Sequence, residues 1–129
     1  MNQTFQKAKI MVVDDTPENL DLLRSLLQEN GYQPFCFPNG NLALKAARKS
    51  PPDLILLDVI MPSGIDGFEV CRQIKTDEKL QNIPVIFISA INEYKEKLTG
   101  FRVGGSDFIS KPFQADEVLA RIKTHLNLH

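Results

Sequence analysis

Short apolar runs alternate with stretches of helical periodicity along this chain of 129 residues, and this alternation constrains the fold more than any other feature. The apolar runs predict strands at residues 9–13, 32–37, 54–57, 83–89 and 107–109, and Pro34 places the second strand at a sheet edge. Strands that alternate with helices form a mostly parallel sheet covered on both faces. We therefore expect an α/β fold: a doubly wound five-stranded parallel sheet of flavodoxin-like order 2-1-3-4-5, with helices on both faces.

The helices are predicted from capping residues and from the spacing of apolar side chains. Thr16 and Pro17 are typical of an N-cap and a first helical position, and Asn30-Gly31 is typical of a helix end. Further helices are predicted through Leu42 to about Lys49, along Phe68, Cys71 and Ile74, from Asn92 to about Thr99, and along Val118, Leu119, Ile122 and Leu126.

Composition narrows the class of protein. Hydrophobic residues make up 43% and charged residues 24%, which argues against disorder, and a net charge of −1 excludes a strongly basic nucleic-acid-binding domain. Cys36 and Cys71 stand far apart, so they form no metal-binding pair and indicate small buried side chains. No segment resembles a membrane span or a signal peptide. We expect one cytoplasmic domain over residues 1–129, with its core at about 9–126, that contacts neither membrane nor nucleic acid.

Polar residues stand where the predicted strands end. Asp14 and Asp15 follow the first strand, Asp58 ends the third, Ser89 ends the fourth, and Lys111 follows the fifth. The carboxyl ends of parallel strands form the ligand-binding edge of such a sheet, so we expect these side chains to meet. Three carboxylates repel one another unless a divalent cation lies among them, and oxygen ligands favour Mg²⁺. Since a carboxylate can also accept a phosphoryl group, the cluster predicts phosphoryl acceptance and not broad catalysis.

Four segments resemble the receiver domains of bacterial two-component response regulators. They are Val12-Val13-Asp14-Asp15, Leu57-Asp58-Val59-Ile60-Met61-Pro62, Ile88-Ser89-Ala90 and Asp107-Phe108-Ile109-Ser110-Lys111-Pro112-Phe113, within a similarity from Ile10 to Leu126. The resemblance implies that Asp58 is the phosphoacceptor. It also implies that Asp14, Asp15, Asp58 and the backbone carbonyl of Ile60 bind Mg²⁺, with Mn²⁺ as an alternative.

The resemblance further implies a signalling switch, which catalyses only its own phosphorylation and dephosphorylation. Ser89 matches the switch hydroxyl, Lys111 matches the lysine that neutralises the phosphoryl oxygens, and the Lys111-Pro112 peptide is expected to be cis. Phe108 matches the aromatic switch, which turns inward when Ser89 moves to the phosphoryl group. The surface expected to change comprises the fourth helix, fifth strand and fifth helix.

One departure from the family lies just after Asp58. The family motif is M-P-x-M-D-G, whereas residues 61–67 carry one residue more, so we expect the loop to bulge. Ile60 and Ile91 occupy the two positions that modulate loss of the phosphoryl group in the family. Both are apolar and cannot position a water, so we expect self-dephosphorylation over hours and not seconds.

The implied partners are a sensor histidine kinase or phosphotransfer protein as donor, and an output domain or protein that the sequence does not identify. Dimerisation through the fourth helix, fifth strand and fifth helix is a further expectation by analogy. The chain is expected to be either a stand-alone receiver or one piece of a longer regulator or hybrid kinase.

Two other functions remain alternatives. A phosphate-independent docking module is disfavoured by the full set of site residues. An aspartyl phosphatase is disfavoured because Asp14-Asp15-Thr16 lacks the D-x-D-x-T spacing. At single residues, Asp14-Asp15 could be a helix cap and Phe108 a core aromatic that never moves.

Overall fold

The computed structural model describes residues 7–62, 64–90 and 93–127. The sheet has five strands in the order β2-β1-β3-β4-β5, and every neighbouring pair is parallel. The strands are β1 (Lys9–Val13), β2 (Gln33–Phe37), β3 (Leu54–Asp58), β4 (Val85–Ser89) and β5 (Asp107–Ser110). The predicted fold class and strand order are confirmed, and β2, which contains Pro34, lies at an edge of the sheet.

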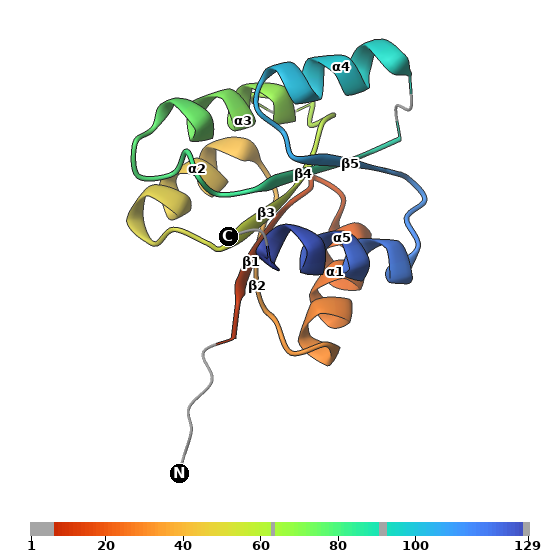
Figure 1. Ribbon diagram of the computed structural model, residues 1–129. Helices are drawn as coiled ribbons and strands as arrows, with labels where there is room; N and C mark the ends of the chain where they lie inside the picture. The colour runs from red at the N-terminus through yellow and green to blue at the C-terminus, as the bar shows by residue number, and fades with distance from the viewer. Residues whose placement is uncertain (1–6, 63, 91–92, 128–129) are drawn as a thin grey trace.

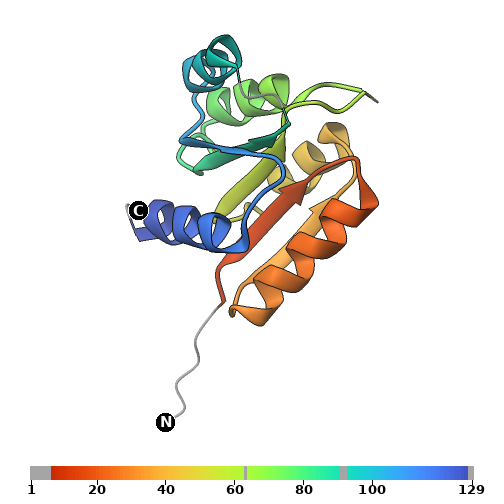
Figure 2. The same ribbon diagram turned by 90° about the vertical axis from the view of Figure 1, so that its right-hand side faces the viewer.

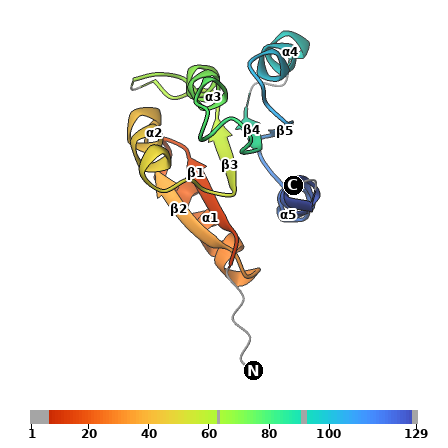
Figure 3. The same cartoon turned by 60° about the vertical axis from the view of Figure 1, so that its left-hand side comes forward.

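Helices cover both faces of the sheet (Figure 1). The helices are α1 (Pro17–Glu29), α2 (Gly40–Lys49), α3 (Gly67–Thr76), α4 (Tyr94–Arg102) and α5 (Ala115–Asn127). Figure 3 shows α1 and α5 on one side of the strands, and α2, α3 and α4 on the other. The right-handed β-α-β crossovers of a parallel sheet produce such a two-sided arrangement.

The core divides into two clusters because successive strand residues point to opposite faces. In β3, Ile55 and Leu57 join the cluster under α2 and α3, whereas Leu54 and Leu56 join the cluster under α1 and α5. All five residues of β3 and of β4 are buried, as the continuous apolar runs predict for central strands. The strand ends are therefore held rigidly on both sides of the sheet.

Two of the predicted elements have a boundary that shifts by two residues or more in the structure. The strand predicted over 83–89 begins at Val85, because Ile83 donates its N–H to the Leu80 carbonyl and Pro84 has no N–H to donate. The helix predicted over 92–99 includes Gly100 and ends at Arg102, while Asn92 lies outside the described residues. A Cβ at Gly100 would lie 3.1 Å from Phe87 Cδ2, so glycine lets α4 approach the sheet closely.

Within residues 7–62, 64–90 and 93–127, no helix is both long enough and apolar enough to cross a bilayer. Cys71 is buried and Cys36 is half-buried. Burial raises the pKa of the Cys71 thiol to about 11, so at neutral pH this side chain is a protonated, weakly polar part of the core.

Candidate functional site

The acidic cluster predicted at the carboxyl edge of the sheet is present. One carboxylate oxygen from each of Asp14, Asp15 and Asp58 lies within 4.8 Å of the others. Asp14 and Asp58 are only 2% and 4% exposed, whereas Asp15 is half-buried. Since β1 and β3 are neighbours in the sheet, the ends of two apolar strands bring the three carboxylates together.

Backbone and side-chain donors orient the two buried carboxylates. Asp14 Oδ1 accepts a hydrogen bond from the Thr16 N–H at 2.9 Å, and Asp14 Oδ2 accepts from Asn19 Nδ2 at 3.3 Å. Asp58 Oδ1 accepts from the Ile60 N–H at 3.3 Å. Thr16 is the N-cap of α1 but makes no side-chain capping bond, so Asp14 turns the chain into this helix. Asn19 was not predicted as a site residue, and only its place in the first turn of α1 could have indicated it.

Lys111 connects the acidic residues across the sheet. Its Nζ lies 3.0 Å from Asp14 Oδ2 and 3.3 Å from Asp58 Oδ2. The Lys111 N–H donates to the Ser89 carbonyl at 2.8 Å, which ties the end of β5 to the end of β4. The Lys111-Pro112 peptide is cis, as predicted. The lysine therefore contacts two of the three carboxylates that the sequence placed beside it.

The charge balance of the site raises the pKa of Asp58. Burial and the neighbouring Asp14 carboxylate raise this pKa to about 6, against the attraction of the Lys111 ammonium. Burial opposes the charge of Lys111, but its hydrogen bond to Asp14 and the charge of Asp58 outweigh that effect and raise the Lys111 pKa. The site therefore holds three carboxylates, and the Lys111 ammonium contacts two of them. This excess of hard oxygen donors fits a divalent cation such as Mg²⁺.

Ser89 and Phe108 lie on the strands beyond Asp58. Asp58 on β3 pairs with Ile88 on β4, so Ser89 is the next residue of β4 after the partner of Asp58. Ser89 is fully buried. Phe108 is also buried, with its ring centroid 5.9 Å from that of Phe87. The Phe87 ring also packs edge-to-face against the ring of Phe68 of α3, with 5.3 Å between the two ring centroids. The aromatic switch candidate thus belongs to a row of three rings.

The loop between β3 and α3 projects from the body of the fold (Figure 2). Ile60 is 47% exposed beside Asp58, whereas its neighbours Val59 and Met61 are buried. The predicted bulge involves Ser63, which lies outside the described residues, as does Ile91.

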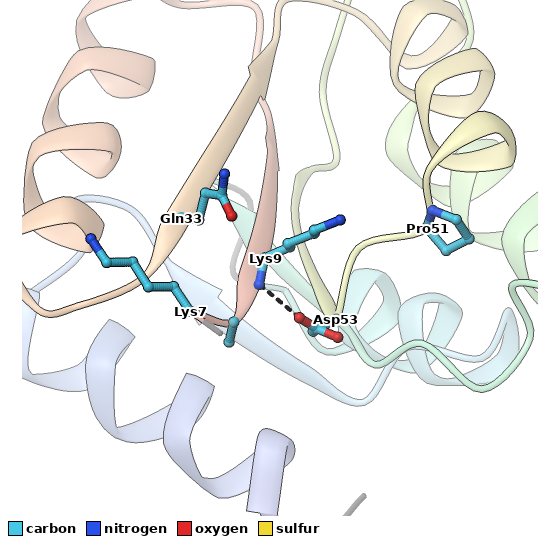
Figure 4. Close-up of a pocket in the computed structure, with 6 residues that line it drawn as sticks. Lys7, Lys9, Gln33, Pro51 and Asp53 are labelled. Atoms are coloured by element: carbon cyan, nitrogen blue, oxygen red, sulfur yellow. Dashed lines mark hydrogen bonds between the residues drawn. The ribbon is translucent and has the colours of Figure 1, made fainter. Parts of the chain in front are cut away.

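Two hollows are alternative candidates for a binding site. One of about 600 Å³ lies at the opposite end of the strands (Figure 4), where Lys7 and Lys9 point apart and Asp53 accepts a hydrogen bond from the Lys9 N–H at 2.7 Å. The residues that line this hollow do not bring a set of reactive or ligand-binding side chains together (Figure 4). A second hollow of about 410 Å³ adjoins the acidic cluster and is lined by Asn19, Leu22, Ala90, Lys111, Pro112 and Phe113.

Comparison with known proteins gives one consistent similarity. The family model described as "Response regulator receiver domain" matches residues 10–123. A putative response regulator from Chloroflexus aurantiacus J-10-fl is 29% identical with a TM-score of 0.90, over 95% of this chain and 99% of that one. The receiver domain of a signal transduction histidine kinase from Syntrophus aciditrophicus is 32% identical with a TM-score of 0.85, over 93% of this chain and 90% of that one. The BeF3-activated DrrB receiver domain is 30% identical with a TM-score of 0.84, over 95% and 99%.

Proposed function

This chain belongs to the response regulator receiver domain family, and from that premise we propose that it accepts a phosphoryl group on Asp58 from a histidine kinase or phosphotransfer protein. The observation that carries the proposal is the position of Lys111 Nζ, 3.0 Å from Asp14 and 3.3 Å from Asp58. A lone structural ion pair would need one carboxylate, whereas Lys111 contacts two, and an oxygen of a third, Asp15, lies within 4.8 Å of theirs. We further propose that residues 1–129 form one receiver domain with its core at about 9–126.

In the proposed reaction, a carboxylate oxygen of Asp58 attacks the phosphorus atom of the donor phosphohistidine. An O–P bond forms while the P–N bond breaks, and its electron pair returns to the imidazole nitrogen. Asp58 must be ionised for this step, and a pKa of about 6 leaves it mostly charged at neutral pH. Lys111 neutralises phosphoryl oxygens as a point charge, and the Ser89 hydroxyl donates to one of them.

The side chains of Asp14, Asp15 and Asp58 and the carbonyl of Ile60 would hold Mg²⁺, or Mn²⁺ in its place. The cation would neutralise charge that develops on the transferring phosphoryl oxygens. The chain's own part is to hold these ligands still: Asp14 by its bonds from Thr16 and Asn19, and Asp58 by its bond from Ile60.

Phosphorylation would act as a switch through Ser89 and Phe108. Movement of Ser89 to the phosphoryl group would leave space for the Phe108 ring and shift a two-state equilibrium of the α4, β5 and α5 surface. That surface would contact the output domain or protein, or a second copy of the chain. The similar DrrB receiver domain is BeF3-activated, which supports a comparable switch in this chain.

The surroundings of the acidic cluster favour a protein donor. Leu22 is 60% exposed and Ile60 is 47% exposed, and the hollow of about 410 Å³ extends the apolar surface along Phe113. Exposed apolar side chains gathered beside a site are typical of a protein-binding surface. A cytoplasmic location and no direct contact with nucleic acid are further parts of this proposal.

Intact-protein mass spectrometry tests the proposal directly. Acetyl phosphate and Mg²⁺ should add one phosphoryl group to the native chain, and neither Asp58→Asn nor an EDTA-treated sample should gain it. A well-folded protein without an adduct would favour the phosphate-independent docking module. The decay of the adduct tests the expected slow self-dephosphorylation; complete loss within a minute at room temperature would contradict the role given to Ile60 and Ile91.

A further inference from the structure

The described residues of the loop between β3 and α3 form an outgoing limb, residues 59–62, and a returning limb, residues 64–66. Val59 and Met61 on the outgoing limb are buried in the core cluster under α2 and α3. Pro62 and Gly64 are exposed, and Ile65 on the returning limb packs against the same cluster. Both limbs are therefore anchored on the cluster under α2 and α3.

Backbone contacts close the base of this loop. The Gly67 N–H donates to the Val59 carbonyl at 2.9 Å. A Cβ on Gly67 would lie only 2.2 Å from the Asp58 carbonyl oxygen, so the returning limb passes against the backbone that leads to Ile60. Asp66 Oδ1 then caps α3 by accepting from the Glu69 N–H at 2.9 Å. Any displacement of the returning limb would consequently reach Val59 and Ile60.

Ile65 packs the returning limb against the start of α2. A Cβ on Gly40, the first residue of α2, would lie 3.0 Å from Ile65 Cγ1 and 2.4 Å from Val70 Cγ2. Ile65 and Val70 thus fill the space that Gly40 leaves open. Asn39 fixes this end of α2, because its Oδ1 accepts from the Leu42 N–H at 2.9 Å.

We propose that Ile65 is a positioning residue for the divalent-cation site, because its contact with Gly40 holds the loop that presents the Ile60 carbonyl. The inference rests on the proposed function. Groups that orient metal ligands contribute to metal affinity even when they do not touch the ion, and their loss typically weakens binding by about 10-fold or more. Ile65 supplies that orientation by packing and not by a hydrogen bond.

The test compares Mn²⁺ affinity, followed by electron paramagnetic resonance of the free ion with Mg²⁺ as competitor, in the full chain and its variants. Ile65→Ala should weaken binding roughly 10-fold. The separate variant Ile65→Leu, which keeps the side-chain volume, should bind Mn²⁺ with an affinity within about twofold of the native value. Gly40→Ala, which crowds the same contact from α2, should weaken binding as well.

Leu126→Ala is the matched control. Leu126 is also half-buried, but it belongs to α5 and packs against the cluster on the opposite face of the sheet. It should lower the urea midpoint and leave the Mn²⁺ affinity unchanged. Unchanged affinity in a folded Ile65→Ala protein would overturn the positioning role alone, because native binding would still support the proposed function. Failure of the native chain to bind either cation would overturn both.

Discussion

Replacing Asp58 by Asn should stabilise the metal-free protein at neutral pH. The native fold holds this carboxylate almost fully buried beside Asp14, and its pKa rises from an ordinary value of 3.8 to about 6 even with Lys111 at 3.3 Å. At about 1.4 kcal/mol per pH unit, this rise corresponds to about 3 kcal/mol of lost stability at pH 7. An amide carries no charge, so Asp58→Asn should regain up to about that amount.

The sign of the pH dependence follows from the raised pKa. Below pH 3.8 the Asp58 carboxyl is protonated in both folded and unfolded chains, so it imposes no penalty. As pH rises through about 6, the unfolded chain has already lost its proton and the folded chain must lose it at a cost. The stability advantage of Asp58→Asn should therefore be absent near pH 4, grow between pH 4 and 6, and level off above it.

Urea unfolding followed by far-ultraviolet circular dichroism, with EDTA present and at several pH values from 4 to 7.5, measures this advantage. Asp66→Asn is the control: the residue is exposed and asparagine also caps helices, so its difference from the native chain should stay within about 0.5 kcal/mol at every pH. The reasoning fails if Asp58→Asn is no more stable than the native chain at pH 7. It also fails if the difference does not shrink toward pH 4.

Three further changes have outcomes that urea unfolding can check. Lys111→Met removes the ammonium that offsets Asp58 and should cost about 3 kcal/mol at pH 7, with a smaller deficit at pH 5 where the carboxyl takes up a proton; an equal deficit at both would argue against a charge effect. Gly67→Ala, whose Cβ would meet backbone at 2.2 Å, should cost about 2 kcal/mol or more and slow phosphorylation by acetyl phosphate, whereas native behaviour in both assays would show that the loop base can shift. Phe87→Ala should cost about 3–5 kcal/mol by removing the ring between Phe68 and Phe108, and a loss below 1 kcal/mol would mean that these rings repack.

Much of the fold could be predicted because the relevant patterns are local. The runs that form β3 and β4 are apolar up to the last residue of each strand, and this is what burial on both faces of a parallel sheet requires. The end of α4 could not be predicted in the same way. Glycine weakens a helix interior, and only the nearness of Phe87 to Gly100 explains why α4 continues through that residue.

In the candidate site too, some features could be predicted from the sequence and others could not. The polar residues that end the apolar strands identified the carboxylates, because strand ends of a parallel sheet meet at one edge. The contact between Asn19 and Asp14, and the packing of Ile65 against Gly40, have no sequence signal of their own. These two contacts depend on how the helices and loops pack against the sheet.

The polar residues at the strand ends thus indicated that three carboxylates gather, and at which edge of the sheet they meet. The packed structure was needed for the distances, 3.0 Å from Lys111 Nζ to Asp14 Oδ2 and 3.3 Å to Asp58 Oδ2, and for the rise of the pKa of Asp58 to about 6. The physical reason is that the apolar pattern that predicts a strand is carried by residues close together along the chain. Charge interactions and burial instead depend on distances through space, which the packing of all the elements together sets.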